Sequence, residues 1–315
     1  FNVTPANNVV FFGSSAATVL TASSTTLTVL TPYGASYQYI SVTNLDYNTT
    51  GYSARPFVVT YPSSSGTLNQ LAPAMTLSAG SDPRQHVVKD FNGDNKPDIA
   101  VVNYTGQTIL LFTNTSPAVG SSISFTMQTI SLAGVGSTAL ATDDFDGDGK
   151  PDLAVYITDG STLRVYKNVS TIGGSVSFTN TGLSLATLAT SYAVAVGDFD
   201  LDGRPDIVVA GSTGSTLNVF RNTSTSGTII FNSAQAVSVA STNFIYNLAI
   251  GDIDGDGMPD IVTANDNSNN ISILRNTSIG PGSITYAAAY SFVGGAGGSS
   301  VALALGDLNN DGKLD

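Results

Sequence analysis

The chain has 315 residues with 23 acidic side chains, all of them aspartate, against 11 lysines and arginines, for a formal net charge of −12. This balance and the lack of a basic stripe argue against a nucleic-acid partner, the absence of cysteine excludes disulfides, and no run is long and apolar enough to span a membrane. Charged residues make up only 11% of the chain while Ser, Thr, Gly and Asn are abundant, which is typical of an extended all-β extracellular protein.

The first 61 residues alternate between apolar and polar positions over short stretches and carry no acidic loop. Strands are predicted over 8–13, 17–20, 23–30, 39–44 and 57–61, with turn residues between them. This pattern resembles an IPT/TIG domain, an immunoglobulin-like β-sandwich common on bacterial surface proteins, with its first strand missing. The resemblance implies an Ig-like domain over residues 1–61, and an irregular β cap on the rest of the chain is the alternative.

From residue 62 to 315 the chain is organised by a nine-residue acidic loop that occurs five times, at intervals of 54, 54, 54 and 55 residues. We number the copies loops 1 to 5 and the residues within each copy positions 1 to 9. The copies are Asp90–Asp98, Asp144–Asp152, Asp198–Asp206, Asp252–Asp260 and Asp307–Asp315. A fixed period of this size predicts a repeat architecture.

Positions 1, 3, 5 and 9 of every loop are Asp or Asn, which supply the oxygen ligands that Ca²⁺ prefers. Position 7 varies in side chain, so its main-chain carbonyl is the predicted ligand there, as in an EF-hand loop. Position 6 is Gly, or Asn in loop 1, as a tight turn with positive φ requires. The predicted side-chain ligands are Asp90, Asn92, Asp94, Asp98, Asp144, Asp146, Asp148, Asp152, Asp198, Asp200, Asp202, Asp206, Asp252, Asp254, Asp256, Asp260, Asp307, Asn309, Asp311 and Asp315; the predicted carbonyl ligands are those of Lys96, Lys150, Arg204, Met258 and Lys313.

An EF-hand is excluded because it needs a bidentate Glu at position 12 and flanking helices, whereas this chain contains no Glu and its flanks are predicted strands. The charge distribution supports metal binding, because 18 of the 23 aspartates lie in the five loops. Up to five Ca²⁺ ions, one per loop, would nearly neutralise the chain. Without ions, each loop holds three or four carboxylates that repel one another.

Each period also predicts four short strands. One leads into the loop (for example 194–197) and one follows it (207–210); a third comes after a Gly/Ser/Asn turn (217–220), and a fourth is predicted at Ile123–Phe125, Val176–Phe178, Ile229–Phe231 and Ile284–Tyr286. Four short strands in about 50 residues are typical of a β-propeller blade. A blade buries its faces only against its neighbours, so the repeats are expected to stack around an axis.

Together, the loop, its spacing and the following apolar strand resemble the FG-GAP/VCBS repeat of integrin α-subunit propellers and of many secreted bacterial proteins. The resemblance covers residues 62–315. It implies an all-β propeller of four-stranded blades, usually seven, with one Ca²⁺ per loop on one face. Because the sequence holds four complete periods and parts of others, we expect the propeller to be incomplete here and the chain to be part of a longer protein with further domains.

Catalysis is not expected in this segment. The chain has no Cys, no Glu and a single histidine, His86, which is predicted to replace a core aliphatic residue. Asn114, Asn168, Asn222 and Asn276 each begin an N-x-S motif and lie 54 residues apart. Their period predicts a turn in which Asn caps backbone groups rather than a glycan acceptor.

Two functions remain open from the sequence. The first is an extracellular, calcium-stabilised adhesion or scaffold module of a surface or secreted protein, which acts through contacts with a surface or matrix protein or builds a fibre. The second is a glycan-binding, lectin-type propeller or a targeting module of a polysaccharide-degrading enzyme. The turn after the second strand carries Tyr104, Asp159, Thr213 and Asn267 in the four copies, without a repeated aromatic residue, and this favours the first function.

Overall fold

The computed structural model describes residues 1–32, 35, 38–53, 57, 75–117, 122–187, 191–211, 216–239, 244–266, 270–293, 302–306 and 314. Across these residues the regular structure is antiparallel strands, apart from one short 3-10 turn at Pro5–Asn7. The all-β class predicted from the sequence is therefore confirmed.

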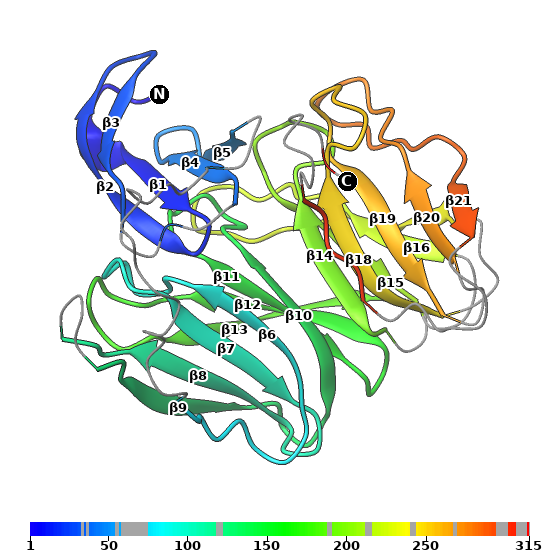
Figure 1. The fold of residues 1–315 in the computed structure, drawn as a ribbon, viewed down its shortest axis with the longest axis horizontal. Helices are drawn as coiled ribbons and strands as arrows, with labels where there is room; N and C mark the ends of the chain where they lie inside the picture. Colours follow the sequence, from blue (N-terminus) through cyan, green and yellow to red (C-terminus); the bar gives the residue numbers. More distant parts are fainter. Residues whose placement is uncertain are drawn as a thin grey trace, which may run out of the picture.

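The acidic repeats form four blades, each an antiparallel sheet whose strands follow one another in chain order. Figure 1 shows the four sheets arranged side by side, with the first strand of each sheet nearest the middle of the molecule. The blades comprise β6 (Pro83–Lys89), β7 (Asp98–Asn103), β8 (Thr108–Asn114) and β9 (Phe125–Ser131); β10 (Ser137–Asp143), β11 (Asp152–Ile157), β12 (Thr162–Asn168) and β13 (Phe178–Ala186); β14 (Ala193–Gly197), β15 (Asp206–Ala210), β16 (Thr216–Phe220) and β17 (Gln235–Ser238); and β18 (Ile245–Gly251), β19 (Asp260–Asn265), β20 (Asn270–Leu274) and β21 (Tyr290–Val293).

The hydrophobic core lies between blades. The second strand of each blade is apolar on both faces, and all six residues of β11 are buried. Three separate clusters fill the spaces between blades 1 and 2, 2 and 3, and 3 and 4. Each blade therefore depends on its neighbour for burial, as expected of stacked repeats. His86 is exposed on β6, so its predicted place in a core is wrong: among the described residues, no blade precedes blade 1 to cover that side.

The fourth strand of every blade begins later than predicted, by two residues in blades 1 and 2 and by six in blades 3 and 4. The segments 229–231 and 284–286 precede β17 and β21 and form only single bridges, at Phe231 and Tyr286. Their apolar side chains pack against the preceding blade instead, where Phe231 is 8% exposed and Ile284 5% exposed. The described residues of the outer strands β9, β13, β17 and β21 are largely exposed, so their alternation gives a weaker signal than these anchoring residues.

The N-terminal residues form one five-stranded antiparallel sheet in the order β3-β2-β1-β4-β5. Its strands are β1 (Asn8–Phe12), β2 (Ser15–Ala22), β3 (Leu27–Leu30), β4 (Ile40–Asn44) and β5 (Thr49–Tyr52). Four of them match predicted strands, β5 was not predicted, and most of the strand predicted over 57–61 lies outside the described residues. The immunoglobulin-like sandwich stays a prediction, because one sheet alone does not define it.

This N-terminal sheet lies against the propeller at the ends of the blades that carry the loops (Figure 1). The backbone N–H of Thr50 donates to the carbonyl of Gly203 in loop 3, over 2.5 Å, and that of Asp90 in loop 1 donates to the carbonyl of Ser14, over 2.6 Å. The Tyr52 hydroxyl donates to Asp143, which ends β10, over 2.8 Å. The sheet is thereby joined to blades 1, 2 and 3.

The periodic asparagines hold adjacent blades together. The Nδ2 group of Asn222 donates to the carbonyl of Pro205 in its own blade and to that of Phe145 in the preceding blade, both over 2.9 Å. Asn168 and Asn276 make the same pairs of bonds, to Phe91 and Pro151 and to Phe199 and Pro259. All three asparagines are buried. Their Oδ1 atoms also accept the N–H of the residue two positions on, so the predicted local cap is confirmed. Their period thus reflects both a capped turn and a repeated hydrogen-bond junction, and their burial leaves no room for a glycan in the folded chain.

We expect Asn222→Ala to lower the free energy of unfolding by about 2 to 4 kcal/mol, because it leaves two buried carbonyls without a donor. Asn114→Ala is the matched control, since the Nδ2 group of Asn114 donates only to Pro97 in its own blade. Chemical denaturation at fixed calcium concentration measures the free energy of unfolding of both variants. Equal losses in the two variants would show that the bond across the junction contributes nothing.

Candidate metal centres

The backbone of each loop is curled by residues with positive φ. Position 6 has φ of 66° at Asn95, 84° at Gly149, 82° at Gly203 and 88° at Gly257, as the sequence predicts. Position 4 is also left-handed in every described loop, including Leu201 with φ of 56°. This second turn was not predicted, because the residue at position 4 is not always glycine.

The curled backbone turns its N–H groups toward two of the carboxylates. In loop 3, the carboxylate at position 1, Asp198, accepts from the N–H groups of Asp202 and Gly203, over 3.0 and 2.8 Å. The carboxylate at position 9, Asp206, accepts from Phe199 over 3.0 Å and from Asn222 over 2.7 Å. Loops 1, 2 and 4 repeat this pattern. Positions 1 and 9 are thus fixed in place without any metal.

Carboxylate oxygens at positions 1, 3 and 9 come together in loops 2, 3 and 4. In each of the three groups, one oxygen from every residue lies within 4.8 Å of the others; the groups are Asp144, Asp146 and Asp152; Asp198, Asp200 and Asp206; and Asp252, Asp254 and Asp260. Loop 1 has an amide, Asn92, at position 3. Position 5 (Asp94, Asp148, Asp202 and Asp256) lies outside these groups, and its Oδ1 accepts the N–H of position 7 instead. The predicted ligands of loop 5 (Asp307, Asn309, Asp311, Lys313 and Asp315) lie outside the described residues.

Two carboxylate oxygens indicate where an ion would be bound. Asp146 Oδ1 and Asp200 Oδ1 are buried and have no hydrogen-bond partner among the described residues. A buried carboxylate oxygen without a partner is costly. A cation held between positions 1, 3 and 9 would satisfy both atoms, so the donor set and the vacant lone pairs fit a hard metal ion.

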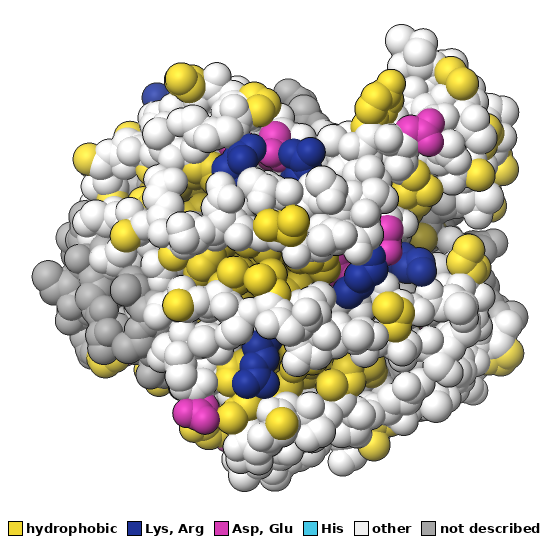
Figure 2. All heavy atoms as spheres, turned by 180° about the vertical axis from the view of Figure 1, so that it is seen from behind, with side chains coloured by type: hydrophobic (Ala, Val, Ile, Leu, Met, Phe, Trp, Pro, Cys, Tyr) yellow, Lys and Arg dark blue, Asp and Glu magenta, His cyan; other side chains and the backbone are white. Residues whose placement is uncertain are grey.

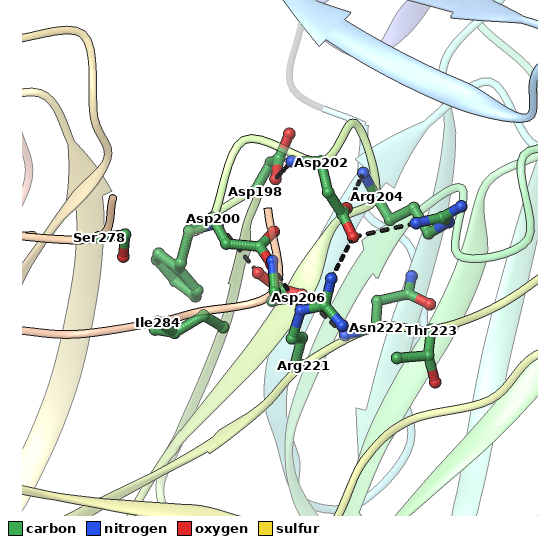
Figure 3. A network of polar contacts seen from close by, with 12 residues as sticks. Asp198, Asp200, Asp202, Arg204, Asp206, Arg221, Asn222, Thr223, Ser278 and Ile284 are labelled. Atoms are coloured by element: carbon green, nitrogen blue, oxygen red, sulfur yellow. Dashed lines mark hydrogen bonds and ion pairs between the residues drawn. The ribbon is translucent and has the colours of Figure 1, made fainter. Parts of the chain in front are cut away.

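Basic side chains from the third strand reach into the same loops, a feature that the sequence reasoning did not identify. Figure 3 shows Arg221 of blade 3 extending from the ribbon toward Asp200 and Asp202. Arg221 Nη2 lies 2.7 Å from Asp202 Oδ2, and Lys167 pairs with Asp146 and Asp148 in the same way. On the face seen in Figure 2, Lys and Arg side chains likewise lie beside Asp side chains in small separate groups.

In the metal-free protein, burial raises the pKa values of most carboxyls at loop positions 1 and 9. Loss of water, with a smaller contribution from nearby carboxylates, raises the pKa of Asp90 to about 6, those of Asp98 and Asp198 to about 7, and that of Asp206 to about 8. Backbone N–H groups act in the opposite direction and lower these pKa values, but they do not outweigh burial. A charged, metal-free loop is therefore unfavourable at neutral pH.

The N-terminal sheet approaches loops 2 and 3 closely enough to require glycine. A Cβ atom at Gly147 would lie 2.6 Å from Asn48 Cβ, and one at Gly203 would lie 2.6 Å from Thr49 Cβ. These glycines therefore serve both the positive φ of the loop and the contact with the sheet. A cavity of about 930 Å³ lies beside this contact, between the N-terminal sheet and the ends of β14 and β18.

The raised pKa values predict opposite pH dependence with and without metal. In metal-free protein, stability from the protonated carboxyls is present below pH 4 and is lost as the pH rises through about 6 to 8, so Tm should fall from about pH 5 to about pH 8. Saturating Ca²⁺ binds the deprotonated form and should reverse this slope. Thermal melts of metal-stripped protein at both pH values, with and without added Ca²⁺, measure this change of Tm with pH. A metal-free Tm that rises with pH would contradict the expectation.

Comparison with known proteins supports the repeat assignment. The FG-GAP-like repeat family matches residues 90–155, 144–209, 198–263 and 252–315, which together span well over half of the chain. No curated protein matches. Among the solved structures that resemble the chain is the rhamnogalacturonan lyase PL11 of Bacillus licheniformis, with 16% identity over 82% of this chain and 53% of that one and a TM-score of 0.34. The rhamnogalacturonan lyase YesW resembles it with 14% identity over 89% of this chain and 62% of that one and a TM-score of 0.36.

The Chaetomium thermophilum Nup170 N-terminal domain, in its complex with Nup53, also resembles the chain, with 14% identity over 65% of this chain and 28% of that one and a TM-score of 0.39. The chain thus spans between 28% and 62% of the lengths of these three structures. The family match coincides with the four described loops and the blades that they join. The chain therefore belongs to the FG-GAP-like repeat family.

Proposed function

We propose that this chain is a calcium-stabilised scaffold or adhesion module of an extracellular protein, which acts through contacts with other proteins. The observation that supports it is that the carboxylate clusters lie at the junctions between blades. Asp200 Oδ2 in loop 3 accepts the N–H of Gly282 from blade 4 over 2.6 Å, and the carbonyl of Phe145 in loop 2 accepts from Asn222 of blade 3. An ion bound at such a loop stiffens its own blade and the contact with the next.

Calcium is the proposed ion because every ligand is oxygen and the loop is acidic and irregular, as suits a large hard cation. The proposed extracellular location follows from the same chemistry, since Ca²⁺ is abundant outside cells. No helix among the described residues is long and apolar enough to cross a membrane.

A structural role for the metal is also favoured over catalysis. The clustered aspartates at positions 1 and 9 are already held by two backbone N–H groups each, and those at position 3 in loops 2 and 3 are held by a basic side chain. His86, the one histidine of the chain, is exposed on β6. We therefore propose no reaction for this segment.

Loss of one loop carboxylate should remove calcium stabilisation without removing the fold. We expect Asp198→Asn to bind one Ca²⁺ fewer and to show a smaller rise of Tm on calcium addition, because the ion stabilises only the folded state. Asp159→Asn, in the exposed turn after β11, is the control and should match the wild type. Isothermal titration calorimetry and thermal melts measure both. Unchanged calcium binding by Asp198→Asn would refute the assignment of position 1 as a ligand.

Glycan binding is the second candidate, and one cavity favours it. A cavity of about 230 Å³ is lined by the starts of the inner strands, including Arg84, Thr138, Tyr192 and Tyr246. The rings of Tyr192 and Tyr246 stack with centroids 4.9 Å apart. Because the loops follow the other ends of these strands, the cavity lies on the face away from the metal centres. Aromatic rings beside polar groups suit a sugar.

A glycan array probed with the folded protein in millimolar Ca²⁺ separates the two candidates. The scaffold function predicts no sugar binding. If a sugar class is bound, Tyr246→Ala should abolish that binding, whereas Tyr290→Ala, an exposed tyrosine on β21, should not. Sugar binding that survives Tyr246→Ala would place the site elsewhere.

A further inference from the structure

One residue on the third strand varies together with loop position 3. Counted from the start of each loop it is position 24, and it is Lys167, Arg221 and Arg275 in blades 2, 3 and 4 but Thr113 in blade 1. Loop position 3 is Asp in the same three blades and Asn92 in blade 1. A basic residue is therefore present wherever position 3 carries a charge.

The two positions are in direct contact. Lys167 Nζ pairs with Asp146, and it lies 3.3 Å from Asp148 Oδ2. Arg221 bridges Asp200 and Asp202, and Arg275 bridges Asp254 and Asp256, with Nη2 3.0 Å from Asp256 Oδ2. Asn92, by contrast, donates its amide hydrogen to the carbonyl of Gly174 in the next blade, over 2.7 Å. A neutral position 3 is thus satisfied by backbone alone, whereas a charged one binds the basic side chain, joined in loop 3 by the N–H of Gly282.

Counted over positions 1, 3, 5, 9 and 24, the four described loops have the same charge. Loop 1 has three aspartates among positions 1, 3, 5 and 9, for a charge of −3. Loops 2, 3 and 4 each have four aspartates and one basic residue at position 24, which again gives −3. Position 7 is outside this count: it is basic in loops 1 to 3, where Lys96 and Arg204 pair with the carboxylate at position 5, and it is Met258 in loop 4.

The pairing also orients the position 3 carboxylate. In loops 2 and 3 the basic side chain binds Oδ2, while Oδ1 of Asp146 and of Asp200 is the buried atom without a partner. The side chains of Asp146 and Asp200 are both 0% exposed. The contact therefore holds one oxygen and leaves the other without a partner among the described residues, in a side chain that is clustered with the carboxylates of positions 1 and 9.

We propose that Lys167, Arg221 and Arg275 are built-in counter-ions matched to an aspartate at loop position 3, which offset its charge, and that Lys167 and Arg221 also position its free oxygen for the metal. The counter-ion limits carboxylate repulsion in the metal-free state and moderates the affinity for the divalent cation. The part that concerns affinity rests on the proposed calcium function, whereas the part that concerns metal-free stability does not.

The combination found in blade 1 provides the test. In blade 2, Lys167→Thr leaves four carboxylates without their counter-ion, so we expect the Tm of metal-free protein to fall by about 5 °C or more. The affinity of loop 2 for Ca²⁺ should rise by about tenfold, because a positive charge beside the ion has been removed. Asp146→Asn with Lys167 retained should weaken Ca²⁺ binding instead.

The double variant Asp146→Asn/Lys167→Thr recreates the Asn92 and Thr113 pair of blade 1. We expect it to recover most of the metal-free Tm lost in Lys167→Thr and to return the Ca²⁺ affinity to near that of the wild type. If the decrease in its metal-free Tm equals the sum of the decreases in the two single variants, the residues do not act as a matched pair and the proposal is overturned.

Two further variants separate a charge effect from a packing effect and a buried pair from an exposed one. Lys167→Met retains the apolar stem, so a Tm equal to that of the wild type would assign Lys167 a packing role and overturn the proposal. Arg275→Thr removes a pair whose arginine is 55% exposed, and its metal-free Tm should change little. The metal-free melts test the pairing even if titration shows that no loop binds Ca²⁺, in which case the proposed function fails alone.

Discussion

The repulsion among three or four carboxylates in each loop, partly buried where two blades meet, is the electrostatic constraint on which the rest of this propeller depends. Water cannot solvate these groups fully, so the chain supplies other partners. Backbone N–H groups bind positions 1 and 9, a basic side chain binds position 3 where that position is charged, and a metal ion can satisfy the oxygens that remain. Loop 3 shows all three elements in one place, with Asp200 Oδ1 as the atom left for the ion (Figure 3).

The same loops carry the contacts between blades, which couples metal binding to the stacking of the repeats. Phe145 of loop 2 packs its ring edge-on against Phe231 of blade 3, with centroids 5.5 Å apart, and its carbonyl accepts from Asn222. Phe91 and Phe199 do the same with Phe178 and Tyr286. A single residue thus contributes both to the core and to the hydrogen bonds of the junction. Movement of a loop would disturb both, so an ion that immobilises the loop also stabilises the neighbouring blade.

The two ends of the propeller differ in ways that bear on function. At the metal end, the N-terminal sheet covers parts of loops 2 and 3 and approaches Gly147 and Gly203 closely. At the other end, the starts of the inner strands surround the small cavity with Tyr192 and Tyr246. Candidate metal centres beneath a covering sheet are suited to a structural role, while an end with aromatic and polar side chains is suited to the proposed recognition of a partner.

The sequence by itself determined the elements whose cause is local. The acidic loops, the left-handed residue at position 6 and the apolar second strands follow from residue chemistry and a fixed period, and the structure confirms them. The local cap predicted at Asn222 is confirmed, since its Oδ1 accepts the N–H of Ser224, but its bond to Phe145 joins residues 77 apart, and no sequence window holds both. The matched pair of Arg221 and Asp200 and the placement of Phe231 before β17 likewise depend on which strands are neighbours. Only the tertiary structure decided these contacts, because stacking brings together residues that a repeat period places a whole blade apart.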